Sequence, residues 1–234
     1  MSIKIKRFAC NQLYENCYVL STPGRCVAID PGFHGEAQLR ELYDYLSGEG
    51  LKLEAILLTH AHFDHVIGVK AIQERFGVPV YMNPADEKIL PEDVIYTDTL
   101  GIKGFDPSFK WTGVDWGDEL ELAGIRFRAI ASPGHTPGGT SWYCESEGAL
   151  FTGDTLFAGT IGRSDFPYSD YDAEMEAILK NLMPLPGSTV VYPGHGDTTT
   201  IGRERVTNPF LEPFNEKEEP FDPDLPGIEI HPFQ

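Results

Sequence analysis

Four times along this chain, an apolar run typical of a buried strand ends at a short turn, and a histidine or an aspartate follows at once. The turns contain glycine, proline or threonine, and the first two are residues that commonly end strands. In α/β folds, the loops after neighbouring strands meet at one edge of a sheet, where these proteins build their sites. We therefore expect one shared site at such an edge. The four segments are residues 59–65, 132–135, 153–154 and 192–195.

The first segment reads Thr-His-Ala-His-Phe-Asp-His and holds four potential metal ligands. Imidazole and carboxylate groups are nitrogen and oxygen ligands that suit zinc, iron and manganese. His60 and His62 stand two residues apart in what we expect to be an extended turn, so their side chains project alike and suit one ion. Asp64 and His65 lie further round the turn and would face a second ion.

The later segments complete both ligand sets. We expect His135 to complete the first set, His195 to complete the second, and Asp154 to bridge the two. Such a set leaves coordination positions open, which is typical of catalytic rather than structural sites. The expected cofactors are two divalent metal ions, zinc first, with iron and manganese as alternatives. Any one of these histidines could instead be a neutral core residue, but burying the whole set unpaired would be costly.

Composition and charge exclude several kinds of partner. The 234 residues carry a net charge of −18, from 18 Lys and Arg against 36 Asp and Glu, so we expect a small-molecule substrate and no nucleic acid. No apolar run exceeds four residues and the N-terminus holds no secretory signal, so we expect no membrane partner and a cytoplasmic protein. Four cysteines without a CxxC pair favour buried thiols, with a Cys10–Cys17 bridge as the alternative. The oligomeric state does not follow from the sequence.

Strand and helix patterns alternate along the chain, which predicts an α/β fold with one domain over residues 1–205. Residues 91–117 have weak periodicity, so we expect a long loop there that covers the site or packs on the fold. Residues 206–234 are rich in proline and acidic residues, and we expect a tail that wraps the domain or is partly ordered. The expected helices are 36–47, 67–76, a short one after Asn83, and 171–182. The expected strands are 3–8, 17–21, 25–30, 54–59, 78–81, 119–122, 125–131, 140–144, 149–152 and 188–192.

The motif at residues 60–65, with the later His135, Asp154 and His195, resembles the signature of the metallo-β-lactamase superfamily. The resemblance spans about residues 3–205 and implies an αββα sandwich, with two mixed β-sheets, helices on the outer faces and two metals at the sheet edge. Further motifs resemble the short glyoxalase II-like branch, which implies hydrolysis of a hydroxyacylglutathione-like thioester by a metal-bridging hydroxide. These motifs are Asp30-Pro31-Gly32, Gly153-Asp154-Thr155-Leu156-Phe157, Gly162-Arg163-Ser164-Asp165-Phe166-Pro167 and residues 202–210.

Two other functions stay open. The motif Gly162-Arg163-Ser164-Asp165-Phe166 also resembles persulfide dioxygenases, which share the fold and would hold one iron with His60, His135 and Asp154. Their last ligand motif usually reads Ala-His-Asp-Tyr, whereas Gly194-His195-Gly196-Asp197 stands here, which favours the hydrolase. Full glyoxalase II enzymes also carry a helical C-terminal domain that contacts the thiol cofactor, where this chain has its proline-rich segment. A metal-binding protein without turnover is the third interpretation, and the complete ligand set disfavours it.

For the hydrolase, the expected catalytic residues are Asp64 and Asp154, because Asp64 could orient the attacking hydroxide and Asp154 could hold both metals. A thioester suits this chemistry, since its leaving thiolate has a conjugate acid with a pKa of about 8.5 and departs without an added acid. An amide would need its nitrogen protonated, and the sequence shows no obvious acid outside the ligand set.

Four residues outside the ligand set have two interpretations each. Asp30 could accept from the far nitrogen of a ligating histidine, or only shape the Asp-Pro-Gly turn. Arg163 could bind a substrate carboxylate or pair with Asp165. Tyr14 and Asn11, in the first hairpin, could line the substrate pocket or serve only the turn.

Overall fold

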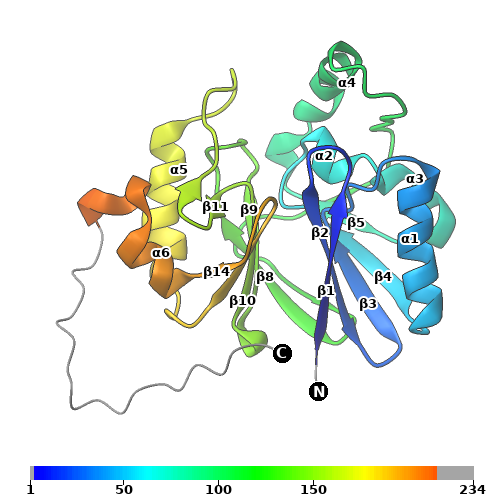
Figure 1. The fold of residues 1–234 in the computed structure, drawn as a ribbon, viewed down its shortest axis with the longest axis horizontal. Helices are drawn as coiled ribbons and strands as arrows, with labels where there is room; N and C mark the ends of the chain where they lie inside the picture. The colour runs from blue at the N-terminus through cyan, green and yellow to red at the C-terminus, as the bar shows by residue number, and fades with distance from the viewer. Residues whose placement is uncertain (1–2, 215–234) are drawn as a thin grey trace.

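Two six-stranded β-sheets pack face to face in the computed structural model, which describes residues 3–214 (Figure 1). The first sheet is mixed, with an antiparallel half that leads into a parallel half. Its strands are, in order, β1 (Lys4–Cys10), β2 (Glu15–Thr22), β3 (Arg25–Ile29), β4 (Lys52–Leu57), β5 (Val80–Met82) and β6 (Thr112–Gly113). The second sheet is antiparallel apart from the β10–β13 pair. Its strands are, in order, β14 (Thr199–Thr200), β13 (Val190–Pro193), β10 (Ala149–Gly153), β9 (Thr140–Cys144), β8 (Ile125–Ala131) and β7 (Glu119–Leu122).

Helices cover the outer face of each sheet. α1 (Gly35–Gly48) and α3 (Val69–Phe76) lie against the first sheet, whereas α5 (Tyr171–Ala177) and α6 (Ile201–Thr207) lie against the second (Figure 1). A turn of π-helix, Ile178–Leu182, continues α5. These four layers are the αββα sandwich that the sequence resemblance implied, so the predicted fold class is confirmed.

Strand β2 shows how the sequence builds two cores at once. Successive side chains of a strand point to opposite faces of the sheet. Cys17 and Val19 pack on the face that the helices cover, whereas Tyr18 and Leu20 pack between the sheets in the same cluster as Trp142. Every residue of β2 is buried, which explains why its middle residues, Cys17–Leu20, are all apolar rather than alternating.

Backbone hydrogen bonds join the two sheets at the edge where the histidine motifs lie. Thr140 N donates to the carbonyl of Thr59 at 2.8 Å, and Asn16 N donates to the carbonyl of Gly194 at 2.7 Å. The Asn16 side chain also donates to the carbonyl of Pro193 at 3.0 Å. Because these bonds cross from one sheet to the other, the loops after β4 and β13 are fixed relative to each other.

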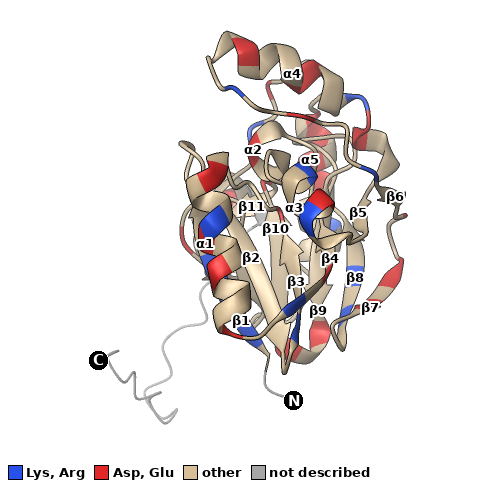
Figure 2. Ribbon diagram, turned by 90° about the vertical axis from the view of Figure 1, so that its right-hand side faces the viewer, with Lys and Arg blue, Asp and Glu red and all other residues tan. Residues whose placement is uncertain are grey.

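One helix lies where the sequence predicted a loop. α4 (Ile89–Thr99) occupies the start of the segment 91–117 and lies directly above α2 (Phe63–Val66), at the top of Figures 1 and 2. The loop prediction is therefore wrong for residues 91–99. The sequence lacks a clean apolar stripe there, because the buried face of the helix includes the polar side chains of Asp93 and Thr97. The buried side chains of α4 are Ile89, Leu90, Asp93 and Thr97.

The folded part of the chain extends beyond the predicted boundary at residue 205. α6 ends at Thr207, and a 3₁₀ segment, Pro209–Phe214, follows with Leu211 buried beside the helices of the second sheet. The rest of the predicted tail, residues 215–234, lies outside the described residues.

Several smaller expectations can be compared with the structure. The short helix expected after Asn83 is present as Pro84–Asp86, and the Asn83 side chain accepts from Ala85 N at 3.0 Å. Another short element, β11 (Leu156–Phe157) paired with β12 (Thr160–Ile161), follows β10. All four cysteines are free and buried. Within residues 3–214, no helix combines the length and the apolarity needed to cross a membrane.

Candidate metal centre

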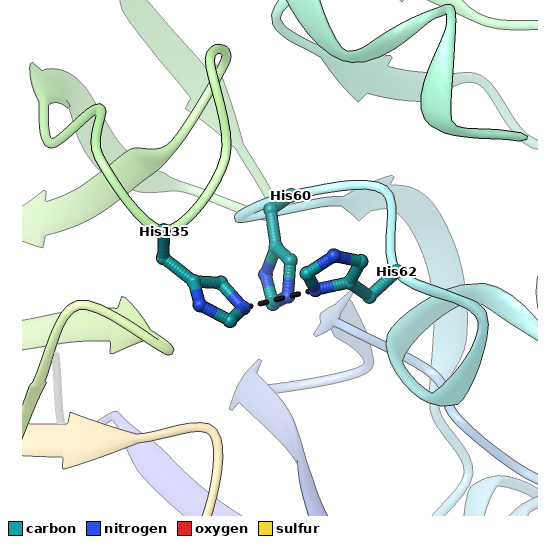
Figure 3. Close-up of side chains that lie close together, drawn as sticks. All are labelled: His60, His62 and His135. Carbon is teal, nitrogen blue, oxygen red and sulfur yellow. Dashed lines mark hydrogen bonds between the residues drawn. The ribbon is translucent and has the colours of Figure 1, made fainter. Parts of the chain in front are cut away.

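Three histidines meet at the shared edge of the sheets. His60 and His62 come from the loop after β4, and His135 comes from the loop after β8 (Figure 3). One ring nitrogen of each lies within 4.8 Å of the others, and Nδ1 of His62 is 2.9 Å from Nε2 of His135. All three side chains are buried. The structure thus brings together the residues expected to hold the first ion.

A second group lies beside the first. Asp64, His65 and His195 have ligand atoms within 4.8 Å of one another, and Nε2 of His195 is 3.2 Å from Oδ2 of Asp64. Asp154, which follows β10, lies between the groups. Its Oδ1 is 3.4 Å from Nε2 of His65, and its Oδ2 is 3.7 Å from Nε2 of His135. This is the place expected for a bridging ligand.

Each of the five histidines is held from outside through one ring nitrogen, so that its other nitrogen faces the cluster. Such outer partners orient metal-binding histidines and fix their tautomers. The contacts are His60 Nδ1 with Thr59 Oγ1 (3.0 Å), His62 Nε2 with Tyr168 Oη (2.7 Å), His65 Nδ1 with Asp30 Oδ2 (3.0 Å), His135 Nδ1 with Arg163 O (2.8 Å) and His195 Nδ1 with Leu13 O (3.2 Å).

Several of the inward-facing atoms have no hydrogen-bond partner within residues 3–214. Nε2 of His60, Nε2 of His65 and Oδ1 of Asp154 are all buried without one. Each unsatisfied atom of this kind costs roughly 1–3 kcal/mol. A divalent ion in each group would satisfy them, and the nitrogen and oxygen donors suit zinc, iron or manganese. The residues present therefore fit two metal ions.

Burial keeps the first group in the protonation state that binds metal. It lowers the pKa of His60 and of His135, and it lowers the pKa of His62 to about 3, so all three are neutral imidazoles at neutral pH. In the second group, burial opposes the charged form of His65. The neighbouring carboxylates, Asp154 first, outweigh burial and raise the pKa of that histidine.

Two glycines make room for this cluster. A Cβ at Gly194 would overlap Oδ1 of Asp154 and lie 2.6 Å from Cε1 of His65. Gly153 has a φ of +51°, and a Cβ there would overlap the side chain of Thr59. Glycine in the motifs Thr-Gly-Asp and Pro-Gly-His therefore lets the backbone approach the carboxylate and the ring closely.

Asp30 lies behind the second group and takes both roles that the sequence left open. Its Oδ2 is 3.0 Å from Nδ1 of His65, and the Thr59 amide donates to its Oδ1 at 2.7 Å. Its φ of +48° also makes the turn after β3. Glu15, which the sequence did not single out, is fully buried beside it, with Oε1 3.9 Å from Nδ1 of His65.

Of the three residues expected to contact substrate, one lines the cavity and two do not. Arg163 lines the cavity above the cluster and forms a bidentate pair with Asp165, at 2.7 and 3.0 Å. Asn11 and Tyr14 are not among the described residues that line this cavity. The Asn11 side chain instead donates to the carbonyl of Asp64 at 2.9 Å, and Tyr14 is exposed.

The cavity has a volume of about 560 Å³, and its wall holds apolar residues that the sequence did not single out. Tyr96 could not be found because it lies on α4, where a loop was predicted. Phe166 and Tyr168 did carry a signal, since they belong to or directly follow the Gly-Arg-Ser-Asp-Phe motif. The described lining residues are Leu13, His62, Phe63, Asp64, Glu92, Asp93, Tyr96, His135, Asp154, Arg163, Phe166, Pro167, Tyr168 and His195.

An αββα sandwich whose two sheets deliver two adjacent sets of histidines and aspartates to one edge defines a class of metal-dependent enzymes. The chain belongs to the metallo-beta-lactamase superfamily: a sequence model of that family matches residues 10–195. The family expected from the sequence resemblance is thereby confirmed.

Similar sequences and solved structures agree with this family assignment. The Haemophilus influenzae protein named hydroxyacylglutathione hydrolase GloC is 37% identical over 202 residues, which cover 84% of this chain and 92% of that protein. The Bacillus subtilis probable metallo-hydrolase YqgX is 31% identical over 215 residues, covering 91% and 100%. Among solved structures, TTHA1623 in a di-iron-bound form shares 36% identity with a TM-score of 0.79, covering 88% of this chain and 100% of that one. The BLEG-1 B3 metallo-beta-lactamase shares 35% identity with a TM-score of 0.81, covering 89% and 99%. The family and these relatives support a metal-dependent hydrolase.

Proposed function

We propose that this protein is a binuclear metal-dependent thioesterase whose small-molecule substrates are hydroxyacylglutathione-like thioesters. The observation that carries the proposal is the pair of ligand groups joined by Asp154 at the floor of an open cavity. The identity to the Haemophilus influenzae protein named hydroxyacylglutathione hydrolase supports the substrate class. The free buried cysteines favour a reducing compartment, the cytoplasm, as the place of action.

Each of the two ligand sets is proposed to hold one ion, with zinc as the proposed metal. One set is His60, His62 and His135, and the other is Asp64, His65 and His195, with Asp154 shared. When bound, two divalent ions lower the pKa of water, so that hydroxide is available at neutral pH, and they polarise a carbonyl oxygen.

The proposed role of the Asp64 carboxylate is to orient the attacking nucleophile, which is supported by its membership of the second group and its position in the cavity wall. One contact holds the carboxylate and another holds the backbone of Asp64. His195 approaches its Oδ2 at 3.2 Å, and Asn11 donates to its backbone carbonyl at 2.9 Å.

Leaving-group chemistry favours a thioester over an amide. A thiolate departs unaided because its conjugate acid has a pKa of about 8.5. An amine must be protonated first. The two acids on the far side of the cavity, Glu92 and Asp93, lie on α4, and Asp93 is engaged with the Phe63 amide at 2.6 Å. Because these acids lie outside the ligand groups, the preference for a thioester rests on the leaving group and not on the lack of an acid.

Arg163 is the proposed contact for a substrate carboxylate. Its guanidinium lies over the Phe166 ring at 4.3 Å and pairs with Asp165, and its side chain is 59% exposed. An exposed pair of this kind contributes little stability, so exchange of the Asp165 carboxylate for one on the substrate would cost little.

The test is kcat/KM for hydrolysis of S-lactoylglutathione by the zinc-loaded protein. We expect a value at or above roughly 10⁴ M⁻¹s⁻¹. His62→Ala should abolish it, whereas His34→Ala, which removes a histidine outside the cluster, should leave it unchanged. A value orders of magnitude lower for the zinc-loaded protein would exclude glutathione thioesters as substrates.

The same experiment with iron addresses the alternative of a persulfide dioxygenase. That function would need only His60, His135 and Asp154, and it would leave the second group idle. The intact group around His65 disfavours it. A relative solved in a di-iron-bound form shows that iron is a metal of this fold, so oxygen uptake with a persulfide by the iron-loaded protein is the deciding measurement.

A further inference from the structure

The outer partner of His62 differs in kind from the other four. The carbonyls of Arg163 and Leu13 can accept a hydrogen bond but cannot donate one, and the same is true of the Asp30 carboxylate. The Thr59 hydroxyl already donates its proton to Asp30 at 2.5 Å, so it too accepts from its histidine. The Tyr168 hydroxyl alone among these partners could either donate or accept.

The His62 ring is also turned the other way from its neighbours. Its Nδ1 faces the first group, 2.9 Å from Nε2 of His135, and its Nε2 faces outward, 2.7 Å from Tyr168 Oη (Figure 3 shows the inward side). The other four histidines hold their outer partner with Nδ1. Consequently, His62 binds a metal only in the tautomer that carries its proton on Nε2, and that proton requires an acceptor.

Tyr168 is built to be that acceptor. Its ring stacks on Phe166 at 5.6 Å and 12°, which fixes where the hydroxyl lies. Ser169 donates to the carbonyl of His135 at 2.7 Å, so the segment that carries Tyr168 is tied to a second residue of the same group. Burial raises the pKa of Tyr168, so it remains a phenol at neutral pH.

The proton of that phenol has no other acceptor in the described part of the chain, because the contact with His62 is its one hydrogen bond there. Tyr168 also lines the cavity. When its oxygen accepts from His62, its O–H is therefore free to point into the space where a substrate binds.

We propose that Tyr168 is a positioning residue for the first metal group: its hydroxyl accepts the Nε2 proton of His62, holds the Nδ1 lone pair toward His60 and His135, and turns its own O–H into the cavity. This inference rests on the proposed metal site and names a determinant of its affinity.

Tyr168→Phe tests the proposal, with Tyr96→Phe as the matched control. Both tyrosines line the cavity, but the Tyr96 hydroxyl has no hydrogen bond within residues 3–214. Competition with a chromophoric chelator should show Zn²⁺ bound about 10–100-fold more weakly at one of two sites in Tyr168→Phe, as for other outer partners of metal ligands. The visible absorption of the Co²⁺-loaded protein should change as well. Tyr96→Phe should match the unmodified protein in both measurements.

A measurement on the unmodified protein makes the test independent of how the variant folds. In the Zn²⁺-loaded protein, long-range proton–nitrogen NMR should show His62 with its proton on Nε2, exchanging slowly with water. Unchanged Zn²⁺ affinity and Co²⁺ spectrum in Tyr168→Phe, or a rapidly exchanging Nε2 proton in the unmodified protein, would overturn the role of Tyr168. Since no substrate is used, these results are separate from success or failure of the thioesterase assay.

Discussion

We expect Asp30 to affect metal binding through its contact with His65. Its carboxylate lies 3.0 Å from Nδ1 of that ring and also accepts from the Thr59 amide. Asp30→Asn keeps the shape and tolerates the φ of +48°, since asparagine visits this region readily. We expect it to lose the charge that supports His65, so that Zn²⁺ binding at the second group weakens about 10–100-fold in a chelator competition.

The control for this prediction is Asp44→Asn, which removes a carboxylate from the exposed face of α1. That variant should bind Zn²⁺ with the same affinity and stoichiometry as the unmodified protein. Equal affinity in Asp30→Asn and Asp44→Asn would show that Asp30 serves only the turn.

A substitution at Gly194 tests whether its backbone must lie this close to Asp154 and His65. A Cβ there would overlap Oδ1 of Asp154 and press on His65, and both belong to the cluster. Gly194→Ala should therefore displace the bridging carboxylate and reduce the Zn²⁺ stoichiometry below two, measured by metal analysis after gel filtration. Gly48→Ala is the control, because nothing lies within 4 Å of a Cβ at the end of α1. A full complement of zinc in Gly194→Ala would contradict the geometry.

At the residue scale, the sequence predicted which ligand types meet and one group that orients a ligand, Asp30, but not the partners of the other four histidines. His60–His65 lie in one short stretch directly after β4, and the later ligands repeat the same strand-end pattern, so their convergence follows from strand order. Tyr168 and the carbonyl of Arg163 contact histidines of the cluster. Their segment lies more than 25 residues along the chain from every ligand except Asp154. Nothing in a local pattern encodes that contact, since it depends on how the loop after β12 folds back.

At the element scale, α5 packs directly on two of the metal-site loops. A Cβ at Gly134 would overlap the backbone of Glu174, and one at Gly162 would overlap its carboxylate. Glu174 is fully buried, and burial raises its pKa to about 8. The folded protein therefore holds a proton on Glu174 at neutral pH that the unfolded chain releases.

This proton makes the free energy of unfolding depend on pH. Since the pKa of Glu174 rises from 4.5 to about 8 on folding, its contribution is complete below about pH 4.5 and is lost as the pH rises through about 8. A tenfold difference in proton affinity between the folded and unfolded chain corresponds to about 1.4 kcal/mol. Glu174→Gln removes this dependence. The free energy of unfolding of the variant in urea, relative to that of the unmodified protein, should therefore be higher at about pH 8 than at about pH 5.

Glu176→Gln is the matched control, because Glu176 lies on the same helix with an exposed side chain. The difference between this variant and the unmodified protein should be nearly the same at both pH values. A difference for Glu174→Gln that is likewise independent of pH would mean that its carboxyl is ionised in the folded protein.

The same scale shows which elements a sequence pattern can predict. α5 has an Asp170 cap and apolar residues at helical spacing, and it forms where expected. α4 has neither signal, and it is stabilised by contacts such as Asp93 with the Phe63 amide and Tyr96 with the Phe63 ring. Helices that depend on tertiary contacts of this kind leave little trace in local sequence.

At the scale of the whole molecule, the cluster joins the two sheets. His60, His62, Asp64 and His65 follow β4 of the first sheet, whereas His135, Asp154 and His195 follow strands of the second. The layered fold was predictable because a recognisable motif sits on alternating strands and helices. The face-to-face register of the sheets was not, since it rests on single bonds such as Tyr18 Oη donating to the carbonyl of Pro193 at 2.8 Å.

Because ligands come from both sheets, metal ions should stabilise the sandwich as a unit. Without them, buried atoms such as Nε2 of His60 have no hydrogen-bond partner in the part of the chain that the structure describes. An ion at 1,000 times its Kd adds about 4 kcal/mol of stability, which corresponds to about 10 °C in Tm for a domain of this size. We expect chelator-treated protein to melt at least that far below zinc-loaded protein. His34→Ala should show the same difference and His62→Ala a smaller one, whereas equal melting temperatures with and without zinc would mean that the cluster contributes nothing to holding the sheets together.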